Sequence, residues 1–182
     1  MLVESEAVSE DLLAEVLALD AEVIPTISSQ IKFDPERRYR ELLMTRKEGS
    51  QFLIVRKGTL LAGYIEVVLT GNKEAYVTSL QIRPEMQRTM VASDLLAQLI
   101  DFLRHIPSAI VSTQVSFINS RSIELHKHLG FHEAGSMGEY ILYQTSASEL
   151  IGKYSAVMER QLRTRVKDSG AEGNGKLLQV RP

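Results

Sequence analysis

The sequence has no cysteine among its 182 residues, which excludes disulfide bonds, thiolate metal sites and a cysteine nucleophile. It also has no apolar run near the roughly 18 residues that a membrane-spanning helix needs. The acidic N-terminus lacks the basic and apolar regions of a signal peptide. A net charge of −2 gives no general attraction to nucleic acid or to an anionic membrane. These absences favour a cytoplasmic protein whose partners include neither nucleic acid nor membrane.

The residues that are present suit one globular domain. Hydrophobic residues make up 44% and charged residues 24% of the chain, near the averages for globular proteins. A chain of this length can build one sizeable core and has little room for a second. We place that domain at residues 1–146.

Hydrophobic periodicity predicts the order helix, helix, three strands, helix, strand, helix and two strands. Ser9 is a good N-cap for the first helix, and Asp34 followed by Pro35 begins the second. The later elements are expected at residues 51–55, 60–69, 75–82, 91–103, 109–117 and 120–129, with a final hairpin at 132–145. One face of the strand at 109–117 is expected to carry Val111, Thr113, Val115 and Phe117. This order is typical of an α/β fold with a mixed sheet covered by helices.

The chain beyond this domain has a different character. Apolar residues recur there at three- and four-residue spacing, which predicts an amphipathic helix over residues 147–168. Residues 169–182 are rich in glycine and polar side chains and are expected to be disordered. The apolar stripe of the helix would pack either on the domain's own sheet or on a second copy, which would make a homodimer.

The most informative stretch is residues 80–96, where a strand ends, a polar loop follows and an apolar-faced helix begins. Such a junction aims several backbone N–H groups and the positive end of a helix at one point. It is therefore a ready site for an anion such as pyrophosphate. Most strand-to-helix loops bind nothing, so the junction by itself does not decide the function.

The junction resembles the acetyl-CoA loop of the GNAT superfamily of N-acyltransferases. That family's pattern is Gln/Arg-x-x-Gly-x-Gly/Ala, placed after a strand and before a helix with paired leucines. Gln87 and Ala92 match the pattern. Arg83-Pro84 and Leu95-Leu96 flank it where the family would place such residues.

A second resemblance lies downstream of the first. Asn119 follows a strand and precedes a short helix that ends in the sequence Leu-Gly-Phe at residues 129–131, as in the family's second CoA element. Two elements in the right order and on the right secondary structure are more specific than either alone. The resemblance covers roughly residues 51–143.

The resemblance implies a GNAT-like fold with the C-terminal helix appended to it. It implies acetyl-CoA or another acyl-CoA as co-substrate and a small-molecule or peptide amine as acceptor. Pantetheine would lie where the strands at 75–82 and 109–117 splay apart. The cofactor-binding residues that it implies are Leu80, Gln81 and Ile82 in the strand, Gln87, Arg88, Thr89, Met90, Val91, Ala92 and Ser93 in the loop, and Asn119, Arg121 and Ser122 downstream.

Acyl transfer to an amine requires the amine to be neutral and the thiolate leaving group to be stabilised or protonated. An alkyl amine has a pKa near ~10, so a base or a water chain has to take its proton. Glu66 is the best-placed carboxylate for this role, unless it merely alternates outward from its strand. His126 stands where the family often has a tyrosine general acid, although it also suits a partly exposed helix position. Tyr140 and Tyr143 in the final hairpin are alternative hydroxyl donors.

Met90 departs from the family pattern, which has glycine there because the backbone passes close to the pyrophosphate. Three interpretations are open. The side chain points away and CoA still binds; or it closes the site and the domain is a catalytically silent ligand- or protein-binding module; or the cleft takes another ligand. Arg88 and Thr89 keep the loop polar, which favours the first. The strand at 75–82 has no central carboxylate, which favours the second.

No metal is expected as a cofactor. His126, His128 and His132 lie close together in the sequence. Positions two apart on a helix point to different faces, so these side chains are poorly placed to share one metal ion.

Overall fold

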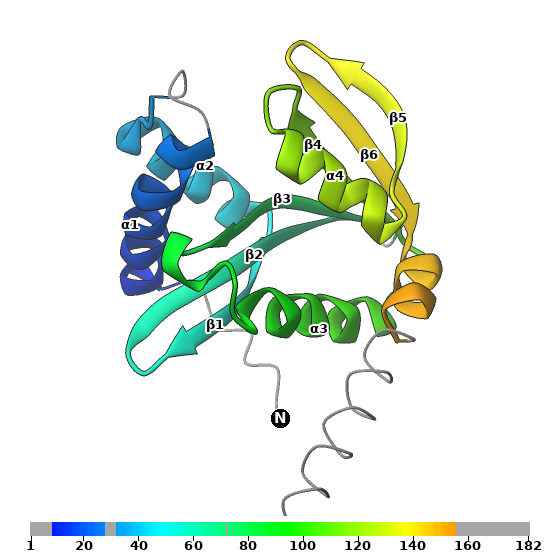
Figure 1. Cartoon of the computed structure of the whole chain (residues 1–182), viewed down its shortest axis with the longest axis horizontal. Coiled ribbons are helices and arrows are strands. Elements are labelled where there is room, and N and C mark those ends of the chain that lie inside the picture. The colour runs from blue at the N-terminus through cyan, green and yellow to red at the C-terminus, as the bar shows by residue number, and fades with distance from the viewer. Residues whose placement is uncertain (1–8, 28–31, 72, 156–182) are drawn as a thin grey trace, which may run out of the picture.

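The computed structural model describes residues 9–27, 32–71 and 73–155. Six strands form one sheet in the order β1-β2-β3-β4-β6-β5 (Figure 1). The elements are α1 (Glu10–Ile27), α2 (Pro35–Lys47), β1 (Gln51–Lys57), β2 (Leu60–Thr70), β3 (Glu74–Ile82), the 3₁₀ turn η1 (Pro84–Met86), α3 (Val91–Arg104), β4 (Ile110–Ser116), α4 (Ser120–Leu129), β5 (His132–Met137) and β6 (Tyr140–Ser146). Neighbouring strands are antiparallel except for β3 and β4, which are parallel. The predicted order of elements and the mixed sheet are confirmed.

Helices cover both faces of the sheet (Figure 1). On one face, the buried Leu95 and Leu103 of α3 join Leu53 and Ile65 of the sheet in the larger core. The apolar residues of α3 recur at helical spacing, so burying that one stripe is what holds the helix against the sheet.

The second core lies on the other face, beneath α1 and α2. Leu13 and Leu42 from these helices pack there with Phe52 and Tyr64 from β1 and β2. Successive strand residues face opposite sides, and both sides of β2 are covered, so residues 61–68 are all buried. This strand therefore shows a nearly continuous apolar run, interrupted by Glu66, in place of an alternating one.

The parallel strands β3 and β4 pair only over their first halves. Their register begins with Glu74 opposite Ile110 and ends with Val77 opposite Thr113. Beyond this point β3 pairs with β2 alone and β4 pairs with β6 alone. The two strands therefore diverge toward their carboxyl ends (Figure 1), as predicted, and residues 78–82 have no strand partner on the β4 side.

The predicted helix starts are confirmed by their capping bonds. The Ser9 hydroxyl accepts a hydrogen bond from the Leu12 N–H at 3.1 Å, and the Asp34 carboxylate accepts one from the Arg37 N–H at 3.0 Å. Gly130 ends α4 with a φ of 93°, a left-handed conformation that favours glycine. Within the described ranges, no helix is long and apolar enough to cross a membrane.

The chain continues into a helix directly after β6. Residues 147–155 are helical, and Leu150 and Tyr154 are buried in the larger core with α3. The apolar stripe of this segment thus packs on the domain itself over its described part. Residues 156–182, which contain the rest of the predicted helix and the predicted disordered tail, lie outside the described residues.

The prediction that the strand and its buried face extend to Phe117 is wrong. Val111 and Val115 are buried as expected, but Phe117 is 51% exposed. The strand ends at Ser116, and the Phe117 N–H donates to the Glu139 carbonyl in the turn between β5 and β6. The alternation of buried side chains therefore stops one residue before Phe117.

Candidate functional site

A cavity of ≈ 400 Å³ lies where β3 and β4 diverge. Its walls come from four places in the chain: the end of α1, the end of β3, the start of α3, and the segment that joins β4 to α4. The lining residues are Val23, Thr26, Ile27, Leu80, Gln81, Ile82, Gln87, Ala92, Leu96, Ile118, Asn119, Ser120, Arg121, Ser122 and Leu125. This volume lies in the range typical of small-molecule sites.

The backbone at the start of α3 offers hydrogen-bond donors to this cavity. The first N–H groups of a helix have no acceptor within the helix. In the described structure Val91 donates weakly to the Thr89 hydroxyl at 3.4 Å, and no protein acceptor is found for the N–H groups of Ala92 and Ser93. Together with the positive end of the helix, these groups suit an anion beside Ala92.

Met90 does not block this helix start. It has φ −70° and ψ −7°, which are ordinary helical values, so the backbone here does not require glycine. Its side chain is 40% exposed. It lines neither this cavity nor a second one, of ≈ 230 Å³, that adjoins the first at the start of α3. The geometry therefore agrees with the first interpretation of Met90, in which the side chain points away from the site.

The two predicted CoA elements meet across the cavity. Arg121 at the start of α4 donates to the side-chain oxygen of Gln87 in the loop at 2.6 Å. The Asn119 carboxamide accepts from the Ser122 N–H at 3.1 Å, so its oxygen caps α4. Its amide nitrogen has no protein partner in the described structure and is available to a ligand.

The structure divides the predicted cofactor-binding residues into two groups. Eight line the cavity: Leu80, Gln81, Ile82, Gln87, Ala92, Asn119, Arg121 and Ser122. Five do not line it with their side chains: Arg88, Thr89, Met90, Val91 and Ser93. All five lie in the loop and the first turn of α3, where any contact with an anion would come from backbone N–H groups rather than side chains.

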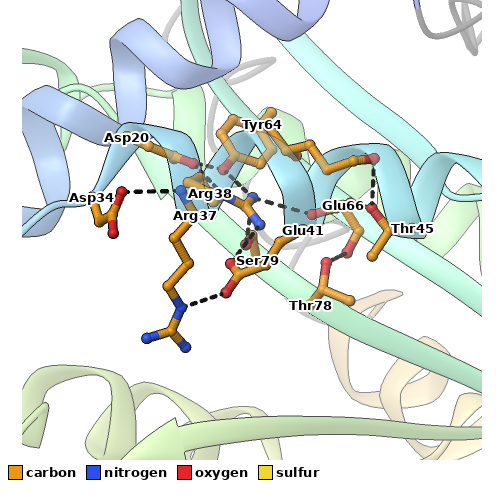
Figure 2. A network of polar contacts seen from close by, with 11 residues as sticks. Asp20, Asp34, Arg37, Arg38, Glu41, Thr45, Tyr64, Glu66, Thr78 and Ser79 are labelled. Carbon is orange, nitrogen blue, oxygen red and sulfur yellow. Dashed lines mark hydrogen bonds and ion pairs between the residues drawn. The ribbon is translucent and has the colours of Figure 1, made fainter.

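Glu66 is held in a buried polar network beneath α1 and α2 (Figure 2). It is 0% exposed, so the interpretation that it alternates outward is wrong. The cause is the cover that α1 and α2 give to this face of β2, where a polar network surrounds its carboxylate. One oxygen accepts from the Thr45 hydroxyl at 2.5 Å, and the other lies 3.2 Å from the Arg38 guanidinium. Glu66 does not line the cavity.

Arg38 joins this network to α1 and β3. Its guanidinium lies 2.7 Å from the Asp20 carboxylate and donates to the hydroxyls of Tyr64 and Ser79, each at 3.2 Å (Figure 2). Tyr64 donates in turn to Asp20 at 2.6 Å. Burial raises the pKa of Asp20, and Arg38 opposes this rise. Ser79 precedes the cavity-lining Leu80, so the network ends beside the site.

His126 packs against aromatic rings rather than into the cavity. Its ring stacks on Tyr143 with centroids 5.7 Å apart and meets Phe131 edge-on at 5.1 Å. Nδ1 donates to the Ser122 carbonyl at 2.7 Å. Burial lowers the pKa of His126, although the hydrogen bond to Ser122 opposes this. A neutral imidazole that does not line the cavity is poorly suited to protonate a leaving group there.

The two tyrosines of the final hairpin lie in different surroundings. Tyr140, at the start of β6, is 45% exposed and does not line the cavity. Tyr143 is fully buried and donates to the Glu133 carboxylate at 3.2 Å. In this conformation neither hydroxyl faces the cavity.

Sequence reasoning missed two parts of this region. Arg38 and Asp20 sit on helices whose polar residues resemble an ordinary solvated face, and only the packing of α1 and α2 on the sheet buries them together. Val23 and Ile27 read as core residues of α1, yet both line the cavity. Within the described ranges, no group of three or more His, Asp or Glu side chains is placed to hold a metal ion.

Comparison with known proteins places this geometry in a family. Residues 16–131, well over half of the chain, match the model of the acetyltransferase (GNAT) family. A search of curated proteins finds no significant match.

The fold is similar to that of several solved structures. PaiA N-acetyltransferase from Thermoplasma acidophilum, in complex with coenzyme A, has a TM-score of 0.66 at 19% identity, covering 80% of this chain and 99% of that one. Ribosomal-protein-S18-alanine N-acetyltransferase from Escherichia coli has a TM-score of 0.63 at 18% identity, covering 79% of this chain and 92% of that one. The protein yncA from Salmonella typhimurium, with its cofactor acetyl-CoA, has a TM-score of 0.56 at 17% identity, covering 77% of this chain and 91% of that one. At these identities the likeness shows the fold alone.

Proposed function

Because the chain belongs to the acetyltransferase (GNAT) family, we propose that it transfers an acetyl group from acetyl-CoA to a primary amine. The observation that carries this proposal is the ≈ 400 Å³ cavity between the diverging ends of β3 and β4, with the start of α3 at its edge. The backbone groups of residues 78–82 that face the β4 side have no strand partner, and they supply hydrogen-bonding groups for an extended pantetheine arm. The N–H groups of Ala92 and Ser93 supply donors for the pyrophosphate.

The transfer itself follows from the chemistry of an amine and a thioester. The ammonium loses one proton, the neutral nitrogen attacks the thioester carbonyl carbon, and the carbon–sulfur bond breaks. The nitrogen then loses a second proton, so one proton ends on the CoA thiol and one passes to solvent. Since no carboxylate is among the described lining residues, water in the open cavity carries these protons.

Glu66 contributes to this reaction as a positioning residue. Its oxygens contact Thr45 and Arg38, and it is fully buried and does not line the cavity, so an amine in the cavity does not reach it. It holds Arg38, which in turn binds the hydroxyl of Ser79 next to the cavity. The network thereby fixes α1 and α2 over β3, where the acceptor would enter past the end of α1.

The first experiment measures binding and turnover on the same preparation. At about 100 times its dissociation constant, acetyl-CoA should stabilise the fold by about 2.7 kcal/mol in a thermal-shift assay. Turnover is followed with a thiol reagent, which reports only released CoA because the chain has no cysteine. Amine-dependent release with an alkylamine or a peptide with a free N-terminus supports the proposal. If millimolar acetyl-CoA gives neither stabilisation of the fold nor release of CoA, the proposal is refuted.

A matched pair of variants checks that the cavity is the site. Arg121→Met removes a cation that lines the cavity, and it should weaken acetyl-CoA binding roughly ten-fold, as expected for one charge-assisted hydrogen bond. Arg104→Met removes an exposed arginine at the far end of α3 and should leave binding unchanged. Equal affinities for the two variants would place the cofactor elsewhere.

The second candidate function is a catalytically silent module that binds acyl-CoA. The observation that favours it is the composition of the cavity, where Arg121 is the one titratable side chain among the described lining residues. Stabilisation by acetyl-CoA without CoA release from any amine would select this function. Acceptor-dependent release would exclude it.

A further inference from the structure

A second cavity, of ≈ 230 Å³, adjoins the first one at the start of α3. The two share Ala92, Leu96 and Leu125 as lining residues, so they lie next to each other along α3 and α4. The far wall of the second cavity comes from the C-terminal helical segment, residues 147–155, which supplies Leu150, Lys153 and Tyr154. This segment lies beyond the family match at residues 16–131.

The segment is fastened to the cofactor side of the domain. The Tyr154 hydroxyl donates to the carbonyl of Ser93, in the first turn of α3, at 2.8 Å. Tyr154 and Leu150 are both buried in the core that contains α3. The wall of the second cavity therefore has a fixed position relative to the N–H groups of Ala92 and Ser93.

The second cavity combines apolar lining residues with one cation, Lys153. Leu96, Leu125 and Leu129 provide surfaces for a flat aromatic ring, and His128 and Lys153 stand at the rim. Lys153 is exposed and has neither an ion pair nor a hydrogen bond within the described structure. Such a cavity fits a heteroaromatic group that carries a phosphate.

The Lys153 ammonium lies over Gly130. A Cβ atom built on Gly130 would lie 3.2 Å from Nζ, so the lysine side chain crosses directly over this glycine at the end of α4. The ammonium therefore lies on the α4 side of the second cavity in this conformation. A ligand bound between the two helices would come within its reach.

We propose that the second cavity holds the 3′-phosphoadenosine end of acyl-CoA, and that Lys153 binds its 3′-phosphate. This inference rests on the proposed function, because the pantetheine and pyrophosphate must occupy the first cavity. Ala92 lines both cavities, so a ligand with its pyrophosphate beside Ala92 can extend one end toward β3 and the other into the second cavity. The C-terminal segment is then part of the cofactor site rather than an appendage.

The test compares CoA with 3′-dephospho-CoA, which differs only by the phosphate in question. Isothermal titration should show that the full-length protein binds CoA roughly ten-fold more tightly than 3′-dephospho-CoA, as one charge-assisted contact predicts. In Lys153→Met this preference should fall to about one, through weaker CoA binding with unchanged 3′-dephospho-CoA binding. Lys153→Arg should keep a preference.

Two control variants separate the role of Lys153 from other effects. Lys57→Met removes an exposed lysine in the hairpin between β1 and β2 and should keep the full preference. Arg88→Met removes a cation of the loop itself; if this variant abolishes the preference and Lys153→Met does not, the proposal is wrong. Loss of affinity for both ligands equally in Lys153→Met would also overturn it, since that pattern means a structural role at the end of α4.

The outcomes distinguish this inference from the proposed function. If the wild-type protein binds both ligands with equal affinity, the inference fails while the cofactor site stands. If it binds neither ligand, both fail together. A preference that Lys153→Met removes and Lys57→Met keeps supports both.

Discussion

Arg38 of α2 lies 3.2 Å from the carboxylate of Glu66 in the middle of β2, and both side chains are almost fully removed from solvent. The same guanidinium lies 2.7 Å from the buried carboxylate of Asp20 on α1. One cation therefore compensates two buried anions that belong to different elements. A buried charge without a partner is strongly destabilising, so α1 and α2 depend on this arrangement for their position on the sheet.

Replacing Arg38 with methionine tests that dependence. Arg38→Met leaves Asp20 and Glu66 buried without a cation, and it should lower the free energy of unfolding by about 3–5 kcal/mol. The neighbouring Arg37→Met removes an arginine whose ion pair with Glu41 is exposed, and it should leave the free energy of unfolding nearly unchanged. Urea unfolding of the two variants measures both. Equal stabilities would show that the buried network does not hold α2.

Gly63 of β2 is predicted to be intolerant of even one added methyl group. A Cβ atom there would lie 2.8 Å from the backbone oxygen of Gln81 and 3.1 Å from side-chain atoms of Leu95 and Val91. Gly63→Ala should therefore destabilise the fold by about 1–3 kcal/mol and weaken acetyl-CoA binding, because it pushes the cavity-lining Gln81 and the start of α3 away.

Gly135→Ala is the matched control for this substitution. Gly135 lies in the edge strand β5, and a Cβ atom there would meet no other atom within 4 Å. The free energy of unfolding of Gly135→Ala should be unchanged or slightly higher, because alanine restricts the conformations of the unfolded chain. If thermal unfolding and titration with acetyl-CoA give the same values for both variants, the close contacts of Gly63 have no energetic consequence.

The elements and their order could be predicted because they follow from local signals. Ser9 and Asp34 cap their helices, and the helical spacing of Leu95, Leu99 and Leu103 marks the face of α3 that is buried. These signals depend on neighbours within a few residues, so one sequence suffices to find them. The junction after β3 was predictable for the same reason.

The surroundings of the candidate catalytic residues could not be predicted in this way. Glu66 occupies a strand position whose side chain would be exposed if α1 and α2 did not cover the sheet there, and its bond to Thr45 joins residues 21 positions apart. His126 is placed by its stacking on Tyr143 from another element. Such contacts arise from packing between elements, which no local pattern encodes.

Met90→Gly is predicted to leave cofactor binding nearly unchanged. Sequence comparison alone suggests tighter binding, because the family pattern has glycine there. In the structure Met90 has an ordinary helical backbone and an exposed side chain outside both cavities, so glycine opens no space for the cofactor. Met90 is the N-cap residue of α3 and makes no side-chain capping bond, and glycine is well tolerated at an N-cap, so the substitution should change stability little. Titration with CoA decides, and a several-fold gain in affinity would show that Met90 does restrict the site.

His126 should make the fold lose stability as the pH falls. Burial holds its pKa below the ordinary value of about 6.5, so in the window between its folded pKa and about 6.5 the unfolded chain binds more protons than the folded one. Stability therefore rises with pH through this window, and the loss persists at lower pH. His126→Gln removes this proton linkage, so its stability should fall less than that of the wild type between pH 7.5 and pH 5.

The measurement is urea unfolding of the wild type and His126→Gln at several pH values. Groups that titrate elsewhere in the chain act on both proteins alike, so the difference between the two curves isolates His126. His128→Gln is the control, because His128 lies on the same helix but is exposed. Its curve should run parallel to that of the wild type. If the His126→Gln curve also runs parallel, the imidazole is not kept neutral by its contacts with Tyr143 and Phe131, and a role for it as a proton donor would regain support.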